Sequence, residues 1–295
     1  MFEGLSVAMV TPFRGGAVDR DATAKLVEHM IDGGVQGLIV SGSTGEAATT
    51  SLEERRALWQ FVKECARGRV WLVAGTGSNN TAETISTTKM AEELGMDGAL
   101  VVTPYYNKPT PKGQVAHFTA VAKSTKLPVI LYNVPGRTAT NTTPDILAMV
   151  QHLPNVKAVK EASGSIDQMS QVRAKTTLTL LSGDDALTLP AIAVGGEGIV
   201  SVAGQAAPRE MRALTDAARA GRTADAEAIH RKLQPLFKAL FVESNPGPVK
   251  FLLAELGLIA NELRLPLVPV EPSTEALVRE VMRSLNLSVA TAARA

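Results

Sequence analysis

Eight short runs of apolar, mostly β-branched residues recur between residues 5 and 202, and they constrain the fold of this 295-residue chain most strongly. Most of them lack alternating polar residues, which is typical of parallel strands buried on both faces. We expect strands at Leu5–Val10, Gly37–Ser41, Val70–Ala74, Ala99–Thr103, Pro128–Tyr132, Val156–Lys160, Leu178–Ser182 and Gly198–Val202.

Segments with helical periodicity separate these runs. They include Asp21–Asp32, Leu52–Cys65, Thr81–Leu94, Gly113–Ser124 and Thr143–Gln151. Ser51 with Glu54 has the spacing of a capping box, and Pro144 after Thr143 suits a first helical turn. Strands that alternate with helices predict right-handed βαβ units. Eight such units predict an α/β fold of the (β/α)8 TIM barrel type.

A doubly wound open sheet is the alternative fold. No GxGxxG pattern follows the first apolar run, however, and eight units exceed what that fold usually needs. Gly75-Thr76-Gly77 lacks a third glycine, and Gly42–Glu46 lacks the lysine of a P-loop. Both glycine patterns are therefore weak indications of a nucleotide site.

After Val202 the pattern becomes helical throughout. We expect helices at Pro208–Ala220, Thr223–Val242, Pro248–Leu256 and Ser273–Leu285. The first would complete the barrel, and the remainder is short for an independent domain. We therefore expect a barrel over residues 1–224 and a C-terminal α-helical appendage over residues 225–295, which packs on the barrel or makes subunit contacts. The tail from 290 to 295 shows no pattern.

Composition and charge narrow the functional classes. A net charge of +1 leaves no large excess of Lys and Arg for binding nucleic acid. The single cysteine, Cys65, excludes a disulfide framework, and four scattered histidines without an HxxxH pair make a metal site an unfavourable hypothesis. No apolar run reaches about 18 residues, and no basic segment opens the chain, so we expect no membrane span, no secretory signal and a cytoplasmic location.

Lys160 ends the sixth apolar run and is the first candidate for chemistry. Burial shifts a lysine toward its neutral amine, which attacks carbonyl carbons to form imines. A strand-end lysine more commonly extends its amine into water, so the residue alone predicts no reaction. In a barrel, functional residues gather at the carboxyl ends of the strands, so the other strand ends decide between the two interpretations.

Three other strand ends offer partners for such an amine. Ser43 and Thr44 would hold a small carboxylate with their hydroxyls, or simply form a capped turn. Tyr132 ends the fifth run, where it would exchange protons with an imine or only cover the core with its ring. Arg137 offers a planar fork for a substrate carboxylate, with a surface salt bridge as the alternative.

The remaining strand ends are less specific. Tyr105 and Tyr106 lie in a proline-bracketed loop and suit subunit anchors, proton-relay groups or both. Gly183 would open the backbone to a ligand, whereas Asp184 and Asp185 precede a helix and are expected to cap it. Jointly, the strand ends favour a lysine nucleophile with a phenol, a hydroxyl pair and a carboxylate-binding arginine.

These residues resemble the dihydrodipicolinate synthase family, also called 4-hydroxy-tetrahydrodipicolinate synthase, among the pyruvate-dependent class I aldolases that include N-acetylneuraminate lyase. The resemblance covers nearly the whole chain. It runs through Val10–Phe13, Gly42–Glu46, Ala74–Gly77, Pro104–Pro109, Tyr132–Thr138, Val159–Ala162, Ser182–Asp185 and Glu243–Lys250. The segment that contains Arg137 best distinguishes the synthase from other enzymes of the group, because the lyases generally have a different segment there.

The resemblance implies a reaction. Lys160 would form an imine with pyruvate, and the derived enamine would add to L-aspartate 4-semialdehyde to give 4-hydroxy-tetrahydrodipicolinate, the first committed intermediate toward diaminopimelate and lysine. Thr44, Tyr132 and Tyr106 would relay protons, with Tyr106 supplied by a neighbouring subunit. No cofactor or metal is implied.

The resemblance also implies substrate-binding residues and an assembly. Ser43 and Thr44 would hold the pyruvate carboxylate, Arg137 would bind the semialdehyde, and Gly183 and the backbone of Val200 would face the substrate or Lys160. The implied assembly is a homotetramer built as a dimer of tight dimers. The alternative enzyme is another pyruvate-dependent aldolase or lyase, either N-acetylneuraminate lyase-like or a 2-keto-3-deoxy sugar acid aldolase. A catalytically silent ligand-binding or regulatory barrel is the third class.

Many bacterial members of the family bind lysine at the tight-dimer interface as a feedback inhibitor. The corresponding positions are Ala47, Ala48, Leu52, Arg55, Asn79, Glu83 and Tyr105. Asn79, Glu83 and Tyr105 keep the expected chemistry. Leu52 and Arg55 stand where lysine-sensitive members often have histidines, and Ala47 lacks a hydroxyl.

We predict weak or absent inhibition by lysine, because Leu52 and Arg55 replace groups that would bind it. Steady-state rates measured at increasing lysine concentration test this prediction. A sub-millimolar inhibition constant would contradict it.

Overall fold

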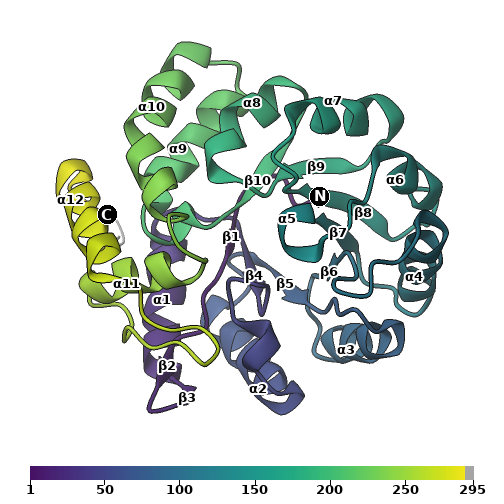
Figure 1. The fold of residues 1–295 in the computed structure, drawn as a ribbon, viewed down its shortest axis with the longest axis horizontal. Helices are drawn as coiled ribbons and strands as arrows, with labels where there is room; N and C mark the ends of the chain where they lie inside the picture. The colour runs from purple at the N-terminus through teal and green to yellow at the C-terminus, as the bar shows by residue number, and fades with distance from the viewer. Residues whose placement is uncertain (290–295) are drawn as a thin grey trace.

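A computed structural model describes residues 1–289 and contains eight parallel strands that close into a barrel (Figure 1). The order around the barrel is β1-β10-β9-β8-β7-β6-β5-β4, and β4 pairs with β1 to close it. The predicted (β/α)8 fold is confirmed. The strands are β1 (Gly4–Ala8), β4 (Gly37–Val40), β5 (Trp71–Gly75), β6 (Gly98–Val102), β7 (Val129–Asn133), β8 (Val156–Glu161), β9 (Thr179–Ser182) and β10 (Gly198–Ser201).

Helices surround the barrel, one layer outside the strands (Figure 1). They are α1 (Arg20–Asp32), α2 (Leu52–Ala66), α3 (Thr81–Glu93), α4 (Pro111–Lys123), α6 (Pro144–Val150), α7 (Ile166–Lys175), α8 (Thr188–Ala193) and α9 (Pro208–Arg219). The capping box of Ser51 and Glu54 is present, and Thr143 caps α6 ahead of Pro144. These local signals explain why the predicted helix starts lie within two residues of the observed ones.

Several short elements escaped the sequence analysis. They are the hairpin of β2 (Phe13–Arg14) and β3 (Ala17–Val18), the single-turn helix α5 (Pro135–Thr138), and the short helices η1 (Ala47–Thr49), η2 (Asp185–Leu187) and η3 (Ala203–Gln205). Segments of two to four residues are too short to show a helical or strand period. Helices α7 and α8, of ten and six residues, were also not assigned.

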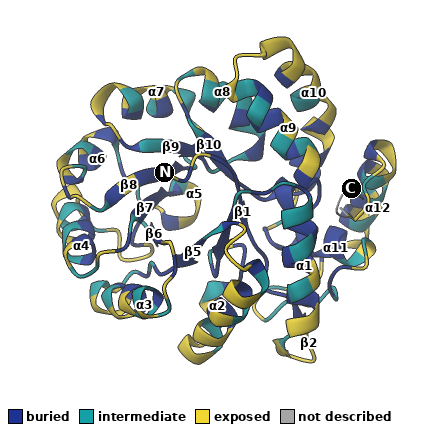
Figure 2. Ribbon diagram, turned by 180° about the vertical axis from the view of Figure 1, so that it is seen from behind, coloured by how far each residue is buried: buried dark blue, intermediate teal, exposed yellow. Residues whose placement is uncertain are grey.

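Two apolar layers hold the barrel together, and Figure 2 shows its strands as the buried centre of the molecule. One layer lies between strands and helices. The other fills the barrel interior and is made by Phe2, Ala8, Ile39, Val73, Leu100, Ile130, Tyr132, Val134, Ala158, Leu181 and Val200. Alternate residues of a strand share a face, so Lys160, two residues after Ala158, points into the barrel above this layer.

An irregularity between β7 and β8 sets the register at their carboxyl ends. Val129 pairs with Val156, but Ile130 pairs with Ala158, so β8 contains one extra residue at Lys157. Beyond this point Tyr132 lies opposite Lys160. Without the shift, the phenol-bearing residue would face Val159, and the two polar side chains would be out of register.

The C-terminal helices are α10 (Thr223–Ala239), α11 (Gly247–Glu255) and α12 (Pro272–Leu285). The boundary predicted between residues 224 and 225 falls in the first turn of α10. The division into two domains stays a prediction, and residues 290–295 lie outside the described part of the chain. Within residues 1–289, no helix is long and apolar enough to span a lipid bilayer.

Charged contacts attach this C-terminal region to the mouth of the barrel. Glu46, just before η1, forms an ion pair with Lys250 of α11, and both side chains are fully buried. Lys250 also donates to the Glu262 carbonyl oxygen at 2.8 Å, with its Nζ 4.3 Å from the Phe13 ring centroid. Arg264 pairs with Glu54 at 2.5 Å. The region after α10 is therefore tied to the β4–α2 segment through charges that solvent screens little.

We predict that Lys250→Met lowers the free energy of unfolding by roughly 3–5 kcal/mol, because it leaves the buried Glu46 carboxylate unpaired while keeping the side-chain volume. Urea-induced unfolding measures this. Arg231→Met is the control, because it removes an exposed Arg231–Glu227 pair on α10 and should change stability little. Equal effects of both substitutions would contradict the prediction.

Candidate active site

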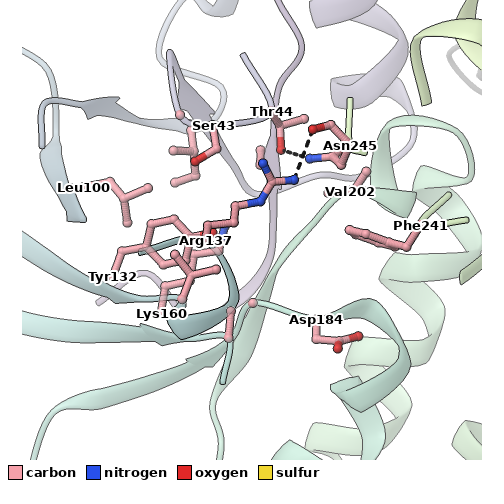
Figure 3. A pocket seen from close by; sticks show the side chains of 16 residues that line it. Ser43, Thr44, Leu100, Tyr132, Arg137, Lys160, Asp184, Val202, Phe241 and Asn245 are labelled. Carbon is pink, nitrogen blue, oxygen red and sulfur yellow. Dashed lines mark hydrogen bonds between the residues drawn. The ribbon is translucent and has the colours of Figure 1, made fainter. Parts of the chain in front are cut away.

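A cavity of about 160 Å³ opens at the carboxyl ends of the barrel strands (Figure 3). It brings together most of the residues proposed from sequence. Its lining consists of Ala8, Ile39, Gly42, Ser43, Thr44, Leu100, Tyr132, Val134, Arg137, Lys160, Ala162, Gly183, Asp184, Val202, Phe241 and Asn245. These residues come from seven of the barrel strands or the segments that follow them, and from the loop between α10 and α11.

Lys160 lies at the floor of this cavity and is 5% exposed. The pKa of its amine is lowered to about 8, mainly by burial; the Asp185 carboxylate opposes this shift and the Arg137 charge contributes to it. An amine with a pKa near 8 is about one-tenth neutral at pH 7, whereas an ordinary lysine is less than about 0.1% neutral. The site thus provides a nucleophilic amine at neutral pH.

Tyr132 lies beside this amine. The Lys160 Nζ is 4.3 Å from the centroid of the Tyr132 ring. Burial raises the pKa of the phenol to about 12, although the nearby Arg137 charge and a hydrogen bond with the Ser43 side chain act in the opposite direction. Tyr132 therefore enters any reaction as a neutral phenol, which can donate a proton and accept another.

The loop after β4 positions Ser43 and Thr44 through tight backbone contacts. Ser41 has a positive φ of 59°, and its hydroxyl accepts a hydrogen bond from the Trp59 indole at 3.0 Å. A Cβ built at Gly75 of β5 would lie 2.1 Å from the Ser41 carbonyl oxygen, so only glycine allows this approach. The two hydroxyl residues are consequently held at the cavity wall.

Thr44 and Arg137 share one neighbour, Asn245. The Asn245 side-chain nitrogen donates to the Thr44 hydroxyl at 2.8 Å, and the Arg137 Nη2 donates to the Asn245 carbonyl oxygen at 3.1 Å (Figure 3). Arg137 comes from α5, which follows β7 directly. Its guanidinium thus reaches across the cavity rather than forming a surface salt bridge.

Glycine is required at position 183 on steric grounds. A Cβ there would lie 2.7 Å from the Ala162 Cβ and 3.0 Å from the Lys160 Cε. Any side chain at this position would therefore displace the lysine. Gly183 keeps space beside the amine for a small ligand.

The two acidic residues after β9 have different roles. Asp184 caps η2 by accepting a hydrogen bond from the Ala186 amide, as expected. The expectation was wrong for Asp185, which is fully buried and accepts from the Ser201 hydroxyl at 2.5 Å and from the Val202 and Ala203 amides. It thus joins the end of β9 to the end of β10, and burial raises the pKa of its carboxyl.

Two candidates lie outside the cavity of their own chain. Tyr106 is 87% exposed and has a positive φ of 70° in the β6–α4 loop. Val200 is buried in the barrel interior and does not line the cavity, whereas Val202 does.

A second cavity, of about 370 Å³, adjoins the first and shares Ser43, Tyr132, Arg137 and Asn245 with it. Five of the seven positions that correspond to the lysine effector site line this cavity: Ala47, Ala48, Arg55, Glu83 and Tyr105. Leu52 and Asn79 do not line it. Arg55 donates to the Ala47 carbonyl oxygen and to the Thr50 hydroxyl.

The contributors to the first cavity that the sequence did not indicate include Phe241, Val202 and Asn245. The segment Glu243–Lys250 was noted, but only as part of a resemblance. Asn245 and Thr44 are 201 positions apart in the chain, so no local spacing could have joined them. Within residues 1–289, no three His, Cys, Asp or Glu side chains are grouped to hold a metal ion.

Comparisons with known proteins agree with this arrangement. The sequence matches the Dihydrodipicolinate synthetase family over residues 1–285. A 4-hydroxy-tetrahydrodipicolinate synthase of Magnetococcus marinus is 48% identical over 289 residues, which cover 97% of this chain and 99% of that protein. The crystal structure of dihydrodipicolinate synthase from Aquifex aeolicus is 41% identical with a TM-score of 0.96, covering 98% of this chain and 100% of that one. The chloride-inhibited dihydrodipicolinate synthase of Acinetobacter baumannii, complexed with pyruvate, is 38% identical with a TM-score of 0.95, over 97% of this chain and 100% of that one.

We predict that reductive methylation of Lys160 by formaldehyde and cyanoborohydride increases with pH to a midpoint near 8, because only the neutral amine reacts and burial lowers its pKa to about 8. Mass spectrometry of the modified peptide measures the rate. An amine with the ordinary pKa of about 10.4 would keep gaining rate up to about pH 10. The same peptide in guanidinium-unfolded protein should follow that second course, and identical profiles in both states would contradict the prediction.

Proposed function

This chain belongs to the dihydrodipicolinate synthetase family, and on that premise we propose that it is a Schiff-base-forming lyase that condenses pyruvate with L-aspartate 4-semialdehyde. Its product is 4-hydroxy-tetrahydrodipicolinate, the first committed intermediate toward diaminopimelate and lysine. The observation that carries this function is the buried amine of Lys160, placed with Tyr132 and Arg137 at one cavity. The reaction uses no external cofactor, because Lys160 itself holds the pyruvate covalently.

The neutral amine of Lys160 first attacks the keto carbon of pyruvate. The carbinolamine loses water to give an imine, and loss of a methyl proton then gives an enamine. Each step moves a proton, and the Tyr132 phenol and the Thr44 hydroxyl are the neutral groups at the cavity that can pass it on. Ser43 and Thr44 hold the pyruvate carboxylate, and Gly183 leaves space for the ligand beside the amine.

The enamine carbon then bonds to the aldehyde carbon of the semialdehyde, whose oxygen takes up a proton. The amino group of the same substrate attacks the imine carbon, closes the ring and releases the Lys160 amine. Arg137 binds the carboxylate of this second substrate, because a guanidinium provides two parallel donors that match a carboxylate. Its place across the cavity from Lys160 supports this assignment over a lyase with another acceptor.

Tyr106 completes the proton relay from a neighbouring subunit in this proposal. Its side chain is 87% exposed in a single chain and lies outside the chain's own cavity, as a residue donated across an interface would. A homotetramer built as a dimer of tight dimers would supply it. We further propose that the enzyme acts in the cytoplasm, and that lysine inhibits it weakly or not at all, because Arg55 brings a cation to the adjoining cavity.

Lys160→Ala should lower kcat by at least about a thousandfold, because the covalent intermediate cannot form. Arg137→Ala should raise KM for the semialdehyde by about 10- to 100-fold and impair pyruvate capture much less, because its main effect is to remove a charged contact to the second substrate. A coupled assay with both substrates measures these changes, and borohydride trapping of pyruvate on Lys160 measures capture.

Lys157→Ala is the matched control, because Lys157 is an exposed lysine of the same strand. It should turn over like the unaltered enzyme. Pyruvate trapped elsewhere than at Lys160, or no condensation with the semialdehyde, would reject the proposed function.

A further inference from the structure

Asn245 lies in the loop between α10 and α11, outside the barrel strands, yet it contacts two of the proposed functional residues. It is 6% exposed and lines both cavities. Its side-chain Nδ2 donates to the Thr44 Oγ1 at 2.8 Å, and its main-chain oxygen accepts from Arg137 at 3.1 Å (Figure 3). The side chain therefore acts on Thr44 and the backbone on Arg137.

The direction of the first hydrogen bond determines where the Thr44 proton can go. A threonine hydroxyl has one proton to donate and two lone pairs that accept. Because the amide nitrogen of Asn245 donates, it occupies a lone pair and leaves the Thr44 proton to point elsewhere. Within residues 1–289, the hydrogen bond to the Thr44 hydroxyl comes from Asn245. Thr44 lines the cavity, so its proton is free for a group bound there.

The loop that presents Asn245 is held firmly. The Lys250 amide donates to the Pro246 carbonyl oxygen at 2.9 Å, and the Lys250 side chain pairs with the buried Glu46. A Cβ at Gly247 would lie 2.9 Å from the Val270 Cγ1, so this turn packs closely against the chain that precedes α12. Glu46 and Thr44 belong to the same segment after β4, and that segment is thus bound at two points, to the loop through Asn245 and to α11 through Lys250.

The opposite amide oxygen of Asn245, Oδ1, is buried and has no hydrogen-bond partner. An unpaired buried oxygen is destabilising. The donation to Thr44 is therefore the hydrogen bond that sets the orientation of this amide.

We propose that Asn245 is a positioning residue for the proton relay: by donating to Thr44, it directs the Thr44 hydroxyl proton toward the substrate-derived atoms in the cavity. This inference rests on the proposed function, since it assigns Thr44 a part in proton transfer. Asn245 itself exchanges no proton.

A double-mutant cycle tests this coupling. Asn245→Ala should lower kcat by about 10- to 100-fold, a part of the 10²- to 10⁴-fold that positioned proton transfer contributes. In a Thr44→Val background, the same substitution should change kcat by less than about twofold, because no hydroxyl remains to be oriented. KM for the semialdehyde should change little, because the main-chain oxygen that holds Arg137 is retained.

Asn245→Asp tests the direction of the hydrogen bond. The substitution keeps the shape of the side chain, but an ionised carboxylate only accepts, so it draws the Thr44 proton away from the cavity. We expect kcat to fall at least as far as in Asn245→Ala. A kcat equal to that of the unaltered enzyme would show that the hydroxyl donates to position 245 and would overturn the inference.

Asn261→Ala is the matched control. Asn261 is another asparagine of the C-terminal region whose Oδ1 is buried without a hydrogen-bond partner, but it lines neither cavity. The kcat of the Asn261→Ala variant should equal that of the unaltered enzyme. Circular dichroism and the thermal unfolding midpoint verify that each Asn245 variant is folded, and if Asn245→Ala fails this check, Asn245→Asp decides the question.

The outcomes separate the two proposals. An unaltered enzyme that does not condense the two substrates rejects the proposed function, and this inference with it. If the unaltered enzyme is active but the losses of kcat from Asn245→Ala and Thr44→Val multiply in the double variant, only the inference is rejected. Asn245 would then have a structural role that does not depend on the Thr44 hydroxyl.

Discussion

The candidate site depends above all on the burial of one ionisable group, the amine of Lys160. Lys160 stands above the apolar interior of a closed barrel, where a cation loses its hydration, and its pKa falls to about 8. A more exposed lysine would be protonated and inert toward carbonyl groups at neutral pH. The closed barrel provides this burial, and Gly183 keeps space beside the amine, because a Cβ there would lie 3.0 Å from the Lys160 Cε.

The groups around this amine act in opposite directions on its charge. Asp185 favours the ammonium form, and Arg137 disfavours it. Asp185 is in turn bound by the hydroxyl of Ser201 and by two backbone amides, so it stabilises the rim between β9 and β10 as well. The amine is therefore partly neutral at pH 7, which is the form that the proposed imine formation requires.

Much of the fold could be predicted from sequence, because parallel strands buried on both faces leave continuous apolar runs. The prediction was weakest where structure depends on few residues. The one-residue shift at Lys157, which aligns Tyr132 with Lys160, has no signature in composition or period. The sequence also did not show that Glu46 pairs with Lys250, because either residue alone is typical of an exposed surface.

The sequence by itself determined the barrel and the candidates at its strand ends, namely Lys160, Tyr132, Thr44 and Arg137, since in this fold a strand terminus predicts a place at one mouth. Only the tertiary structure decided what surrounds them. Asn245 reaches Thr44 across 201 positions of the chain, and hydrogen bonds of that kind depend on the three-dimensional path of a loop. Local patterns record burial and periodicity, whereas the direction in which a hydroxyl proton points is set by a neighbour that only folding supplies.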